Sequence, residues 1–222
     1  KNWRDPNEWV KSLKEDIERY KEDPDTILGS SFTSIPDWVT EYLAGQGYDG
    51  IIDTGGSKND KGEIHSVYIP FEPTQIKSKF NVGSFSKDDP RIRFQKKSLL
   101  KKKKKSDKKP VTETKFFKNW FGKSKILDGK GEPLVVFHGT SSQFHNDFAF
   151  DKKLIGTVND DGYYGRGFYF ATHEGEAGYY GQNVGKFYIK MENPYELKVT
   201  GGTWQEMGIN TYNVLKNIDP TL

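Results

Sequence analysis

The chain has 222 residues, of which 33% are hydrophobic, enough to bury one core or two small ones. It has no cysteine, and its four histidines are scattered rather than set at ligand spacing, so no disulfide framework and no metal site are predicted. No run approaches the ~18 consecutive apolar residues of a membrane-spanning helix, and the opening KNWRDPNEW does not resemble a signal peptide. We therefore expect a soluble, cytoplasmic protein without membrane contact.

The net charge of +3 is concentrated in one segment. Residues 96–110, KKSLLKKKKKSDKKP, carry nine Lys and one Asp, a local charge of +8, which leaves −5 for the rest of the chain. A folded nucleic-acid reader would spread its Lys and Arg over one face. We interpret the run as a solvated linker, with a tether to nucleic acid or another anionic surface as the alternative. It divides the chain into a first piece, 1–95, a linker, 96–111, and a second piece, 112–222.

The first piece begins with two predicted amphipathic helices. Residues 5–8, DPNE, combine a cap, a proline at the first helical position and a capping-box acid, and apolar residues follow at helical spacing as far as Tyr20. Residues 34–37, SIPD, start a second helix that stops at Gly45 or Gly47.

Two strands are predicted next. YDGIID at 48–53 has the pattern of a short buried strand, TGGSKNDKG at 54–62 that of a glycine-rich loop, and EIHSVYIPF at 63–71 that of a second strand. Because Pro70 has no N–H to give to a ladder, we expect an edge position or a bulge near the end of this strand.

Short strands and short helices alternate in the second piece. The predicted elements are a helix at 114–122, a DGKG turn at 128–131, the strands PLVVFHG at 133–139 and GFYFA at 167–171, a helix at 173–180, a strand at 185–193 and a helix at 204–215. This alternation predicts an α+β fold with a mostly antiparallel or mixed sheet.

Two stretches place polar and small residues directly behind strands. The strand that ends in His138 and Gly139 offers a side-chain hydrogen-bonding group, followed by a backbone that a flat ligand can approach closely. Tyr180 follows Tyr169 by eleven residues, a spacing that could place two rings on opposite walls of one slot. Taken singly, a histidine behind a strand is more often structural than catalytic, and aromatic residues are normally core. Their combination suggests a nucleotide site.

The stretches FHGT, GRGFYFAT and AGYY resemble the nicotinamide pocket of ADP-ribosyltransferases of the diphtheria-toxin and poly(ADP-ribose) polymerase type, the His-Tyr-Glu class. The similarity is greatest to the ADP-ribosyltransferase domains of phage and mobile-element polyvalent proteins, the ART-PolyVal family, and covers most of residues 112–197. It implies a split antiparallel or mixed sheet with short flanking helices.

The resemblance also implies roles for individual residues. His138 would hold the nicotinamide-side ribose of NAD, Gly139 would pair with the carboxamide through its backbone, and Tyr180 would stack on nicotinamide beside the class tyrosine, Tyr169. Arg166 could reach a phosphate or be a solvated turn residue. The residues implied to bind NAD are His138, Gly139, Thr140, Arg166, Tyr169, Phe170 and Tyr180, with His138 and Tyr169 as the catalytic ones.

The implied activity is that of a mono-ADP-ribosyltransferase, a glycosyltransferase that uses NAD as substrate. The bond between ribose C1′ and nicotinamide would break through an oxocarbenium-like transition state, and ADP-ribose would pass to an unknown acceptor, protein or nucleic acid. The enzyme supplies chiefly positioning and electrostatic stabilisation to such a reaction. A phage-encoded protein of this kind would act in the bacterial cytoplasm of its host.

Two residues depart from the class pattern. Val67 occupies the place of the class glutamate; Glu63 lies four residues earlier, and His65 is closer but is no carboxylate. Ala177 replaces a serine that often bonds the carboxamide. Weak single transfer therefore stays open beside two alternatives, a catalytically inactive interaction module of a phage polyprotein and a nucleic-acid-tethered module that uses the Lys run.

The first piece resembles the other end of the same domain. GYDGII, VYIPFEPTQIKS and NVGSFSKDDPRIRFQ are similar to the closing strands and tail, which here precede the head. The order fits a circular permutation or a window across two tandem domains. Because exposed sheet edges are costly, we expect the two half-domains to dock, within the chain or by exchange between copies.

Overall fold

The computed structural model of the protein describes residues 37–58, 64–81, 85–93, 110–145, 148–155 and 166–197, together with single positions between 11 and 22. For 37–39, 54–58, 64–65 and 197 only the backbone is described. The α-helices are α2 (Asp37–Gly45), α3 (Lys115–Phe121) and α4 (Glu174–Gly178). The strands are β1 (Gly50–Lys58), β2 (Ile64–Pro70), β3 (Ile76–Ser78), β4 (Val136–Thr140), β5 (Phe170–Ala171), β6 (Asn183–Ile189) and β7 (Pro194–Leu197).

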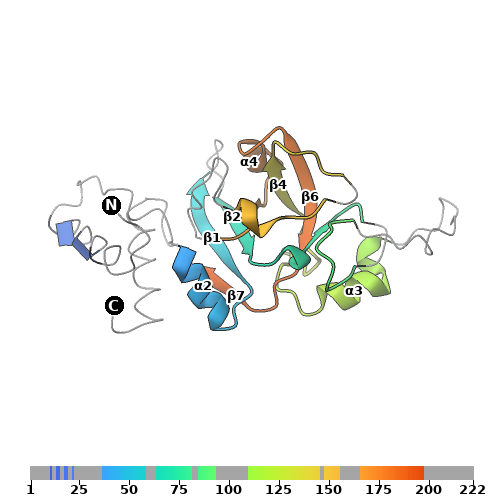
Figure 1. The fold of residues 1–222 in the computed structure, drawn as a ribbon, viewed down its shortest axis with the longest axis horizontal. Coiled ribbons are helices and arrows are strands. Elements are labelled where there is room, and N and C mark those ends of the chain that lie inside the picture. Colours follow the sequence, from blue (N-terminus) through green and yellow to red (C-terminus); the bar gives the residue numbers. More distant parts are fainter. Residues whose placement is uncertain are drawn as a thin grey trace, which may run out of the picture.

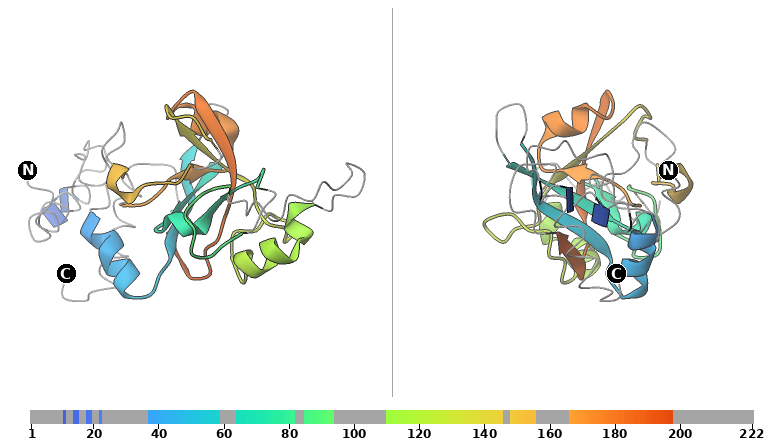
Figure 2. Two further views of the ribbon diagram at one scale, coloured as in Figure 1. Left: turned by 45° about the vertical axis from the view of Figure 1, so that its right-hand side comes forward. Right: turned by 90° about the vertical axis from the view of Figure 1, so that its left-hand side faces the viewer.

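The strands form one seven-stranded sheet in the order β3-β6-β4-β5-β2-β1-β7 (Figure 1). All neighbouring pairs are antiparallel except β1 and β7, which are parallel. Helix α2 lies beside β1 and β7, α3 lies at the other side of the molecule, and α4 lies at the end of β4 (Figures 1 and 2). The predicted α+β class with a mixed sheet is confirmed.

The sheet interleaves the two pieces of the chain. Strands β1, β2 and β3 come from the first piece, and β6, β4 and β5 of the second piece lie between β3 and β2. Neither piece could complete this sheet alone, because each would leave several strand edges unpaired. The expected docking of the two pieces therefore takes place within one chain.

Aromatic packing attaches α3 to one face of the sheet. Thr114 caps the helix by accepting a hydrogen bond from the Phe117 N–H. The buried rings of Phe117 and Trp120 pack with Tyr188 of β6 and with Phe85 from the first piece. A larger apolar cluster occupies the opposite face; its fully buried members include Ile76, Val136, Phe170, Phe187 and Ile189.

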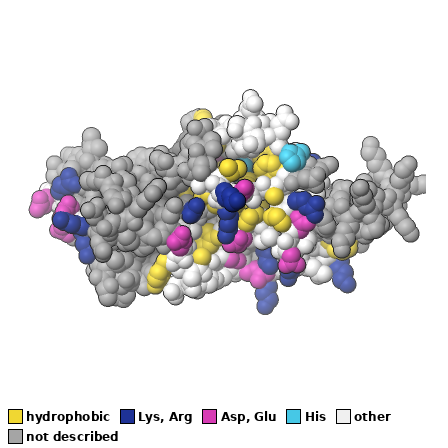
Figure 3. Space-filling view, viewed as in Figure 1, with side chains coloured by type: hydrophobic (Ala, Val, Ile, Leu, Met, Phe, Trp, Pro, Cys, Tyr) yellow, Lys and Arg dark blue, Asp and Glu magenta, His cyan; other side chains and the backbone are white. Residues whose placement is uncertain are grey.

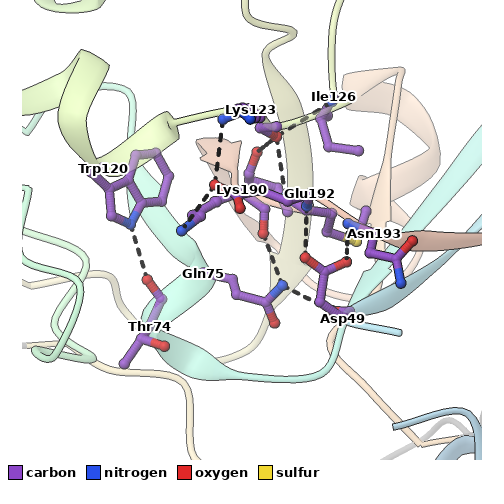
Figure 4. A network of polar contacts seen from close by, with 12 residues as sticks. Asp49, Thr74, Gln75, Trp120, Lys123, Ile126, Lys190, Glu192 and Asn193 are labelled. Carbon is purple, nitrogen blue, oxygen red and sulfur yellow. Dashed lines mark hydrogen bonds and ion pairs between the residues drawn. The ribbon is translucent and has the colours of Figure 1, made fainter. Parts of the chain in front are cut away.

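A polar network joins the two pieces at the lower end of the sheet (Figure 4). The Gln75 side-chain amide donates to the backbone oxygens of Asp49 and Lys190, both at 2.8 Å. The Asp49 carboxylate accepts from the backbone N–H groups of Glu192 and Asn193. Because these polar groups satisfy one another across the two pieces, they fix the register of docking.

Pro70 does not mark an edge strand, because β2 lies between β5 and β1. It is the last residue of β2, and its carbonyl accepts from the Phe168 N–H at 3.2 Å, a contact that needs no donor from proline. The glycine-rich loop predicted from residue 54 is also wrong in part, since β1 continues to Lys58 after a register shift between Asp53 and Ser57. Glycines at an irregularity of this kind relieve crowding without ending the strand.

Other expectations differ in extent or lie outside the described residues. The strand expected at 167–171 is formed only by Phe170 and Ala171, and β3 and β7 were not predicted as strands. The linker from 96 to 109, most of the first helix and the helix expected at 204–215 lie outside the description.

Two surface properties bear on what the molecule contacts. Charged side chains of both signs are interspersed over the face seen in Figure 3, with hydrophobic side chains between them. Within the described residues, the structure has no helix of the length and apolarity that crossing a bilayer would require.

Candidate functional site

The candidate site lies where strands β4 and β5 diverge. Within the described residues these strands pair at one position, Phe137 with Ala171, whereas β4 pairs with β6 along its whole length. His138 lies beside this split, and its side-chain Nδ1 is 2.7 Å from the carbonyl oxygen of Tyr169. The imidazole therefore bonds a carbonyl that a backbone N–H would bond in a continuous ladder.

That hydrogen bond determines which ring nitrogen of His138 carries the proton. A carbonyl oxygen only accepts, so Nδ1 donates and the neutral ring keeps its lone pair on Nε2. Burial lowers the pKa of His138, and the bond to Tyr169 opposes this shift. The ring is partly exposed and packs against Phe150 and Phe170, with centroids 4.9 and 5.2 Å away. The residue is thus a fixed, neutral acceptor through Nε2.

Helix α4 and the turn behind it close on the end of β4. A Cβ at Gly139 would overlap the carbonyl oxygen of Ala177, and a Cβ at Gly181 would overlap the backbone of Thr140. These two glycines permit a backbone approach that no other residue would allow. Gly139, Thr140 and Ala177 are therefore brought together, and Tyr180, which bonds the Ala177 carbonyl through its N–H, is beside them.

The aromatic residues at the split differ in exposure. Phe170 is 1% exposed and supports His138 from the core. Tyr169 is half-buried, whereas the ring of Tyr180 is 55% exposed. The two tyrosine rings are therefore more exposed than that of Phe170, which packs against the histidine from the core.

Arg166 is not brought into this cluster. Its backbone N–H donates to Thr40 Oγ1 at 2.8 Å, and its guanidinium lies 3.9 Å from the Glu41 carboxylate of α2. Arg166 precedes β5 in the chain and contacts α2 of the first piece. Its arrangement gives no support to a phosphate contact.

Val67 lies on β2, on the side of β5 that faces away from β4. It pairs with Ala171 of β5 and with Asp53 of β1, so these three side chains share one face of the sheet. By alternation Tyr169 shares that face, whereas His138 shares the face of Phe170. Asp53 is a fully buried carboxylate opposite Val67. Glu63 and the side chain of His65 lie outside the described residues.

Sequence reasoning missed the residues that hold the histidine. Phe144 and Phe150 follow β4 in an irregular segment, and both rings contact His138. Their spacing fits neither strand nor helix periodicity, so no sequence signal identified them. The sequence likewise gave no sign that Gly181 is required, because the reason appears only in the fold, where the backbone of Thr140 leaves no room for a side chain.

Comparison with known proteins agrees with this geometry. Residues 128–218 match the model of the family described as ADP-Ribosyltransferase in polyvalent proteins, ART-PolyVal. The match includes β4, β5, α4, β6 and β7 and supports an ADP-ribosyltransferase type of function in general. No curated protein and no solved structure shows a significant match to the chain. The second piece of this chain thus matches the ADP-ribosyltransferases of polyvalent proteins, as the motifs around His138 and Tyr169 predicted.

Proposed function

We propose that the protein binds NAD at the split between β4 and β5 and transfers ADP-ribose from it to an acceptor, releasing nicotinamide. The observation that carries the proposal is the hydrogen bond between His138 Nδ1 and the Tyr169 carbonyl. It holds the imidazole at the strand mouth in the form that accepts a hydroxyl proton through Nε2.

The residues at the split fit NAD in four respects. His138 accepts from a ribose hydroxyl, and its lowered pKa keeps the acceptor neutral at pH 7. The backbone of Gly139, which is buried at the end of β4, would pair with the carboxamide as the family resemblance implies. Tyr180 presents an exposed ring on which nicotinamide would stack. Thr140, next to Gly139, completes the polar strand end.

The chemistry to be performed is cleavage of the glycosidic bond between ribose and nicotinamide. This chain contributes orientation of the ribose by His138 and exclusion of water by the closely packed Gly139 and Ala177. It contributes no carboxylate at Val67, so neither stabilisation of positive charge on the ribose nor activation of an acceptor hydroxyl comes from that strand position. We therefore expect slow, single transfer without chain elongation.

A second candidate is a catalytically inactive module of the same fold. Val67 favours it, because an apolar side chain in register with Ala171 leaves the face of Tyr169 without the class carboxylate. Such a module would bind NAD, or a partner, without turnover.

The order of the two pieces belongs to the same proposal. Residues 1–95 would be the C-terminal half and 112–222 the N-terminal half of one ADP-ribosyltransferase-like domain, a view supported by the interleaved strands of the sheet. A chain rearranged so that 112–222 precedes 1–95 should fold with the same stability and bind NAD equally. Failure of the rearranged chain to fold would contradict the half-domain assignment.

The test of function is nicotinamide release from NAD, followed by mass spectrometry together with any mass gain of the protein. His138→Ala should abolish release, while His145→Ala, an exposed histidine outside the split, should leave it unchanged. Silence of the parent with activity in Val67→Glu would establish the inactive module. Silence in both, with no binding of NAD, would contradict the proposal.

A further inference from the structure

A groove with a volume of about 530 Å³ lies on the sheet next to the candidate site. It is lined by the start of β6, by Gln143 and Phe144 of the segment behind β4, and by Ser78, Phe80 and Arg93 from the first piece. Its volume is within the range of small-molecule and nucleotide sites. Because its lining comes from both pieces of the chain, the groove exists only when the two pieces dock.

An arginine and an aromatic ring are held together at this groove. The Arg93 guanidinium carbon lies 5.7 Å from the centroid of Phe80, and Arg93 Nε donates to Ser78 Oγ at 3.3 Å. Within the described part of the chain, no hydrogen bond or ion pair engages the two terminal nitrogens of Arg93. The ring of Phe80 is 58% exposed although it is large and apolar. A cation with free donors beside an exposed ring is a pair that binds phosphate and base together.

The remaining lining fits the same ligand. Gln143, Gln182 and Asn183 contribute side-chain amides, which can bond base edges as donors and acceptors. Among the described residues that line the groove there is no Asp or Glu. Lys186, the other cation, is engaged by Glu174 at 2.7 Å, so Arg93 supplies the available positive charge.

We infer that this groove binds single-stranded nucleic acid, with bases stacked on Phe80 and a phosphate held by Arg93. A single strand is indicated because stacking on a side chain requires bases that are not already stacked in a duplex. Arg93 is the cation of the groove lining that Glu174 does not engage, so we place the phosphate contact there. In the sequence, the Lys-rich run begins three residues after Arg93, but the site consists of the described residues alone.

The groove adjoins the split through two contacts. Gly185, which lines the groove, pairs with His138 across β4 and β6, and the ring of Phe144 lies 6.4 Å from that of His138. A strand bound in the groove would therefore lie beside the proposed NAD site. The inference concerns binding and does not depend on catalysis or on NAD.

Fluorescence anisotropy of a labelled single-stranded DNA of about 12 nucleotides tests it, with the full chain and without NAD. Phe80→Leu should weaken binding about tenfold, because it keeps an apolar side chain and removes the ring. Phe80→Tyr should bind like the parent. Phe116→Leu, which removes an equally exposed ring on α3, should have no effect.

Arg93→Gln should weaken binding several-fold and reduce the dependence of log K on log salt by about one ion. Lys130→Gln, with the same loss of charge on an exposed turn outside the groove, should lower affinity less than twofold. Because Phe80 and Arg93 are at the surface, thermal unfolding should be unchanged in the three variants of these two residues.

Three results would overturn the inference. One is a parent chain that does not bind the single strand, or that binds a duplex of the same length at least as tightly. In the second, Phe80→Leu and Arg93→Gln both bind like the parent, whereas replacement of the Lys run by Gln abolishes binding. That result would assign binding to the Lys run. The third is an equal loss of affinity for NAD in Phe80→Leu, which would make the groove part of a dinucleotide site.

Discussion

The two pieces of the chain contribute different kinds of polar residue to the shared sheet. In the second piece, β4 and the turn after α4 carry His138, Gly139 and Tyr180, to which we assign NAD binding. In the first piece, the buried polar side chains of Gln75 and Lys77 bond backbone carbonyls. In our proposal, the second piece therefore carries the binding groups and the first piece supplies buried polar bonds that hold the sheet together, and Val67 is the position at which the first piece could contribute to chemistry.

The largest expected effect comes from filling the space at Gly139. Gly139→Val should lower the free energy of unfolding by about 3 kcal/mol or more, because its side chain would overlap the Ala177 carbonyl and displace α4. NAD binding should be lost with it. Gly175→Ala, in α4 with open space around its Cβ position, should be neutral or slightly stabilising. Urea unfolding distinguishes the two, and parent-like stability of Gly139→Val would refute the close approach.

Lys77 tests the frame. Its ammonium is fully buried and donates to the carbonyls of Asp89 and Arg91, and burial lowers its pKa to about 8, while the Asp89 charge opposes the shift. Between pH 8 and 10.5 the unfolded chain holds a proton that the folded chain has released, so stability rises with pH across this window. The rise should reach about 3 kcal/mol relative to Lys77→Met.

The measurement for Lys77 is urea unfolding of parent and Lys77→Met at both ends of that pH window, with Lys79→Met as an exposed control. NAD affinity at neutral pH should not change in Lys77→Met once the protein is folded. Parallel pH profiles for the parent and Lys77→Met would show that the buried charge has no energetic consequence.

Tyr180 tests the ligand-facing side of the comparison. Tyr180→Ala should weaken NAD binding about tenfold, the upper range for a stacked aromatic pair, with little change in stability because the ring is exposed. Tyr179→Ala removes the neighbouring ring, 69% exposed, and should leave NAD affinity unchanged. Calorimetric titration measures both, and equal effects would remove Tyr180 from the site.

The smallest effect is expected from protonation of His138. Because burial lowers its pKa below the ordinary 6.5, NAD affinity should stay constant down to about that pH and fall a few-fold below it, as Nε2 gains a proton. In the same range the unfolded chain takes up the proton first, so the parent should lose stability relative to His138→Asn as pH falls. Affinity that increases on acidification would contradict the assigned role.

Local patterns predicted the parts of the fold that are determined locally. The apolar runs of β1, β2 and β4 and the helical stripe of α2 could be read directly. Strands β3 and β7 could not, because IKS and PYEL are too short to carry a period and become strands only by pairing with β6 and β1. The prediction that Pro70 marks an edge strand was wrong for a related reason. The carbonyl of Pro70 accepts a hydrogen bond from a neighbouring segment, and this bond does not need the N–H that proline lacks.

The sequence predicted those residues of the candidate site that belong to a family motif, and it did not predict the contacts that these residues make with one another. His138, Gly139 and Tyr180 followed from resemblance to a family. The packing of Phe144 on His138 and of Gly181 on Thr140 depends on segments that meet only in the folded chain. The groove at Phe80 and Arg93 is lined by residues of both pieces, so no single stretch of sequence predicted it.

The most direct test of the account is calorimetric titration of NAD into the parent, into the His138→Ala, Tyr180→Ala double variant, and into His145→Ala. The account predicts that the parent and His145→Ala bind NAD with equal affinity and that the double variant, still folded by circular dichroism, does not. Equal binding by the double variant, or no binding by the parent, would contradict the assignment of the split between β4 and β5 as a nucleotide site.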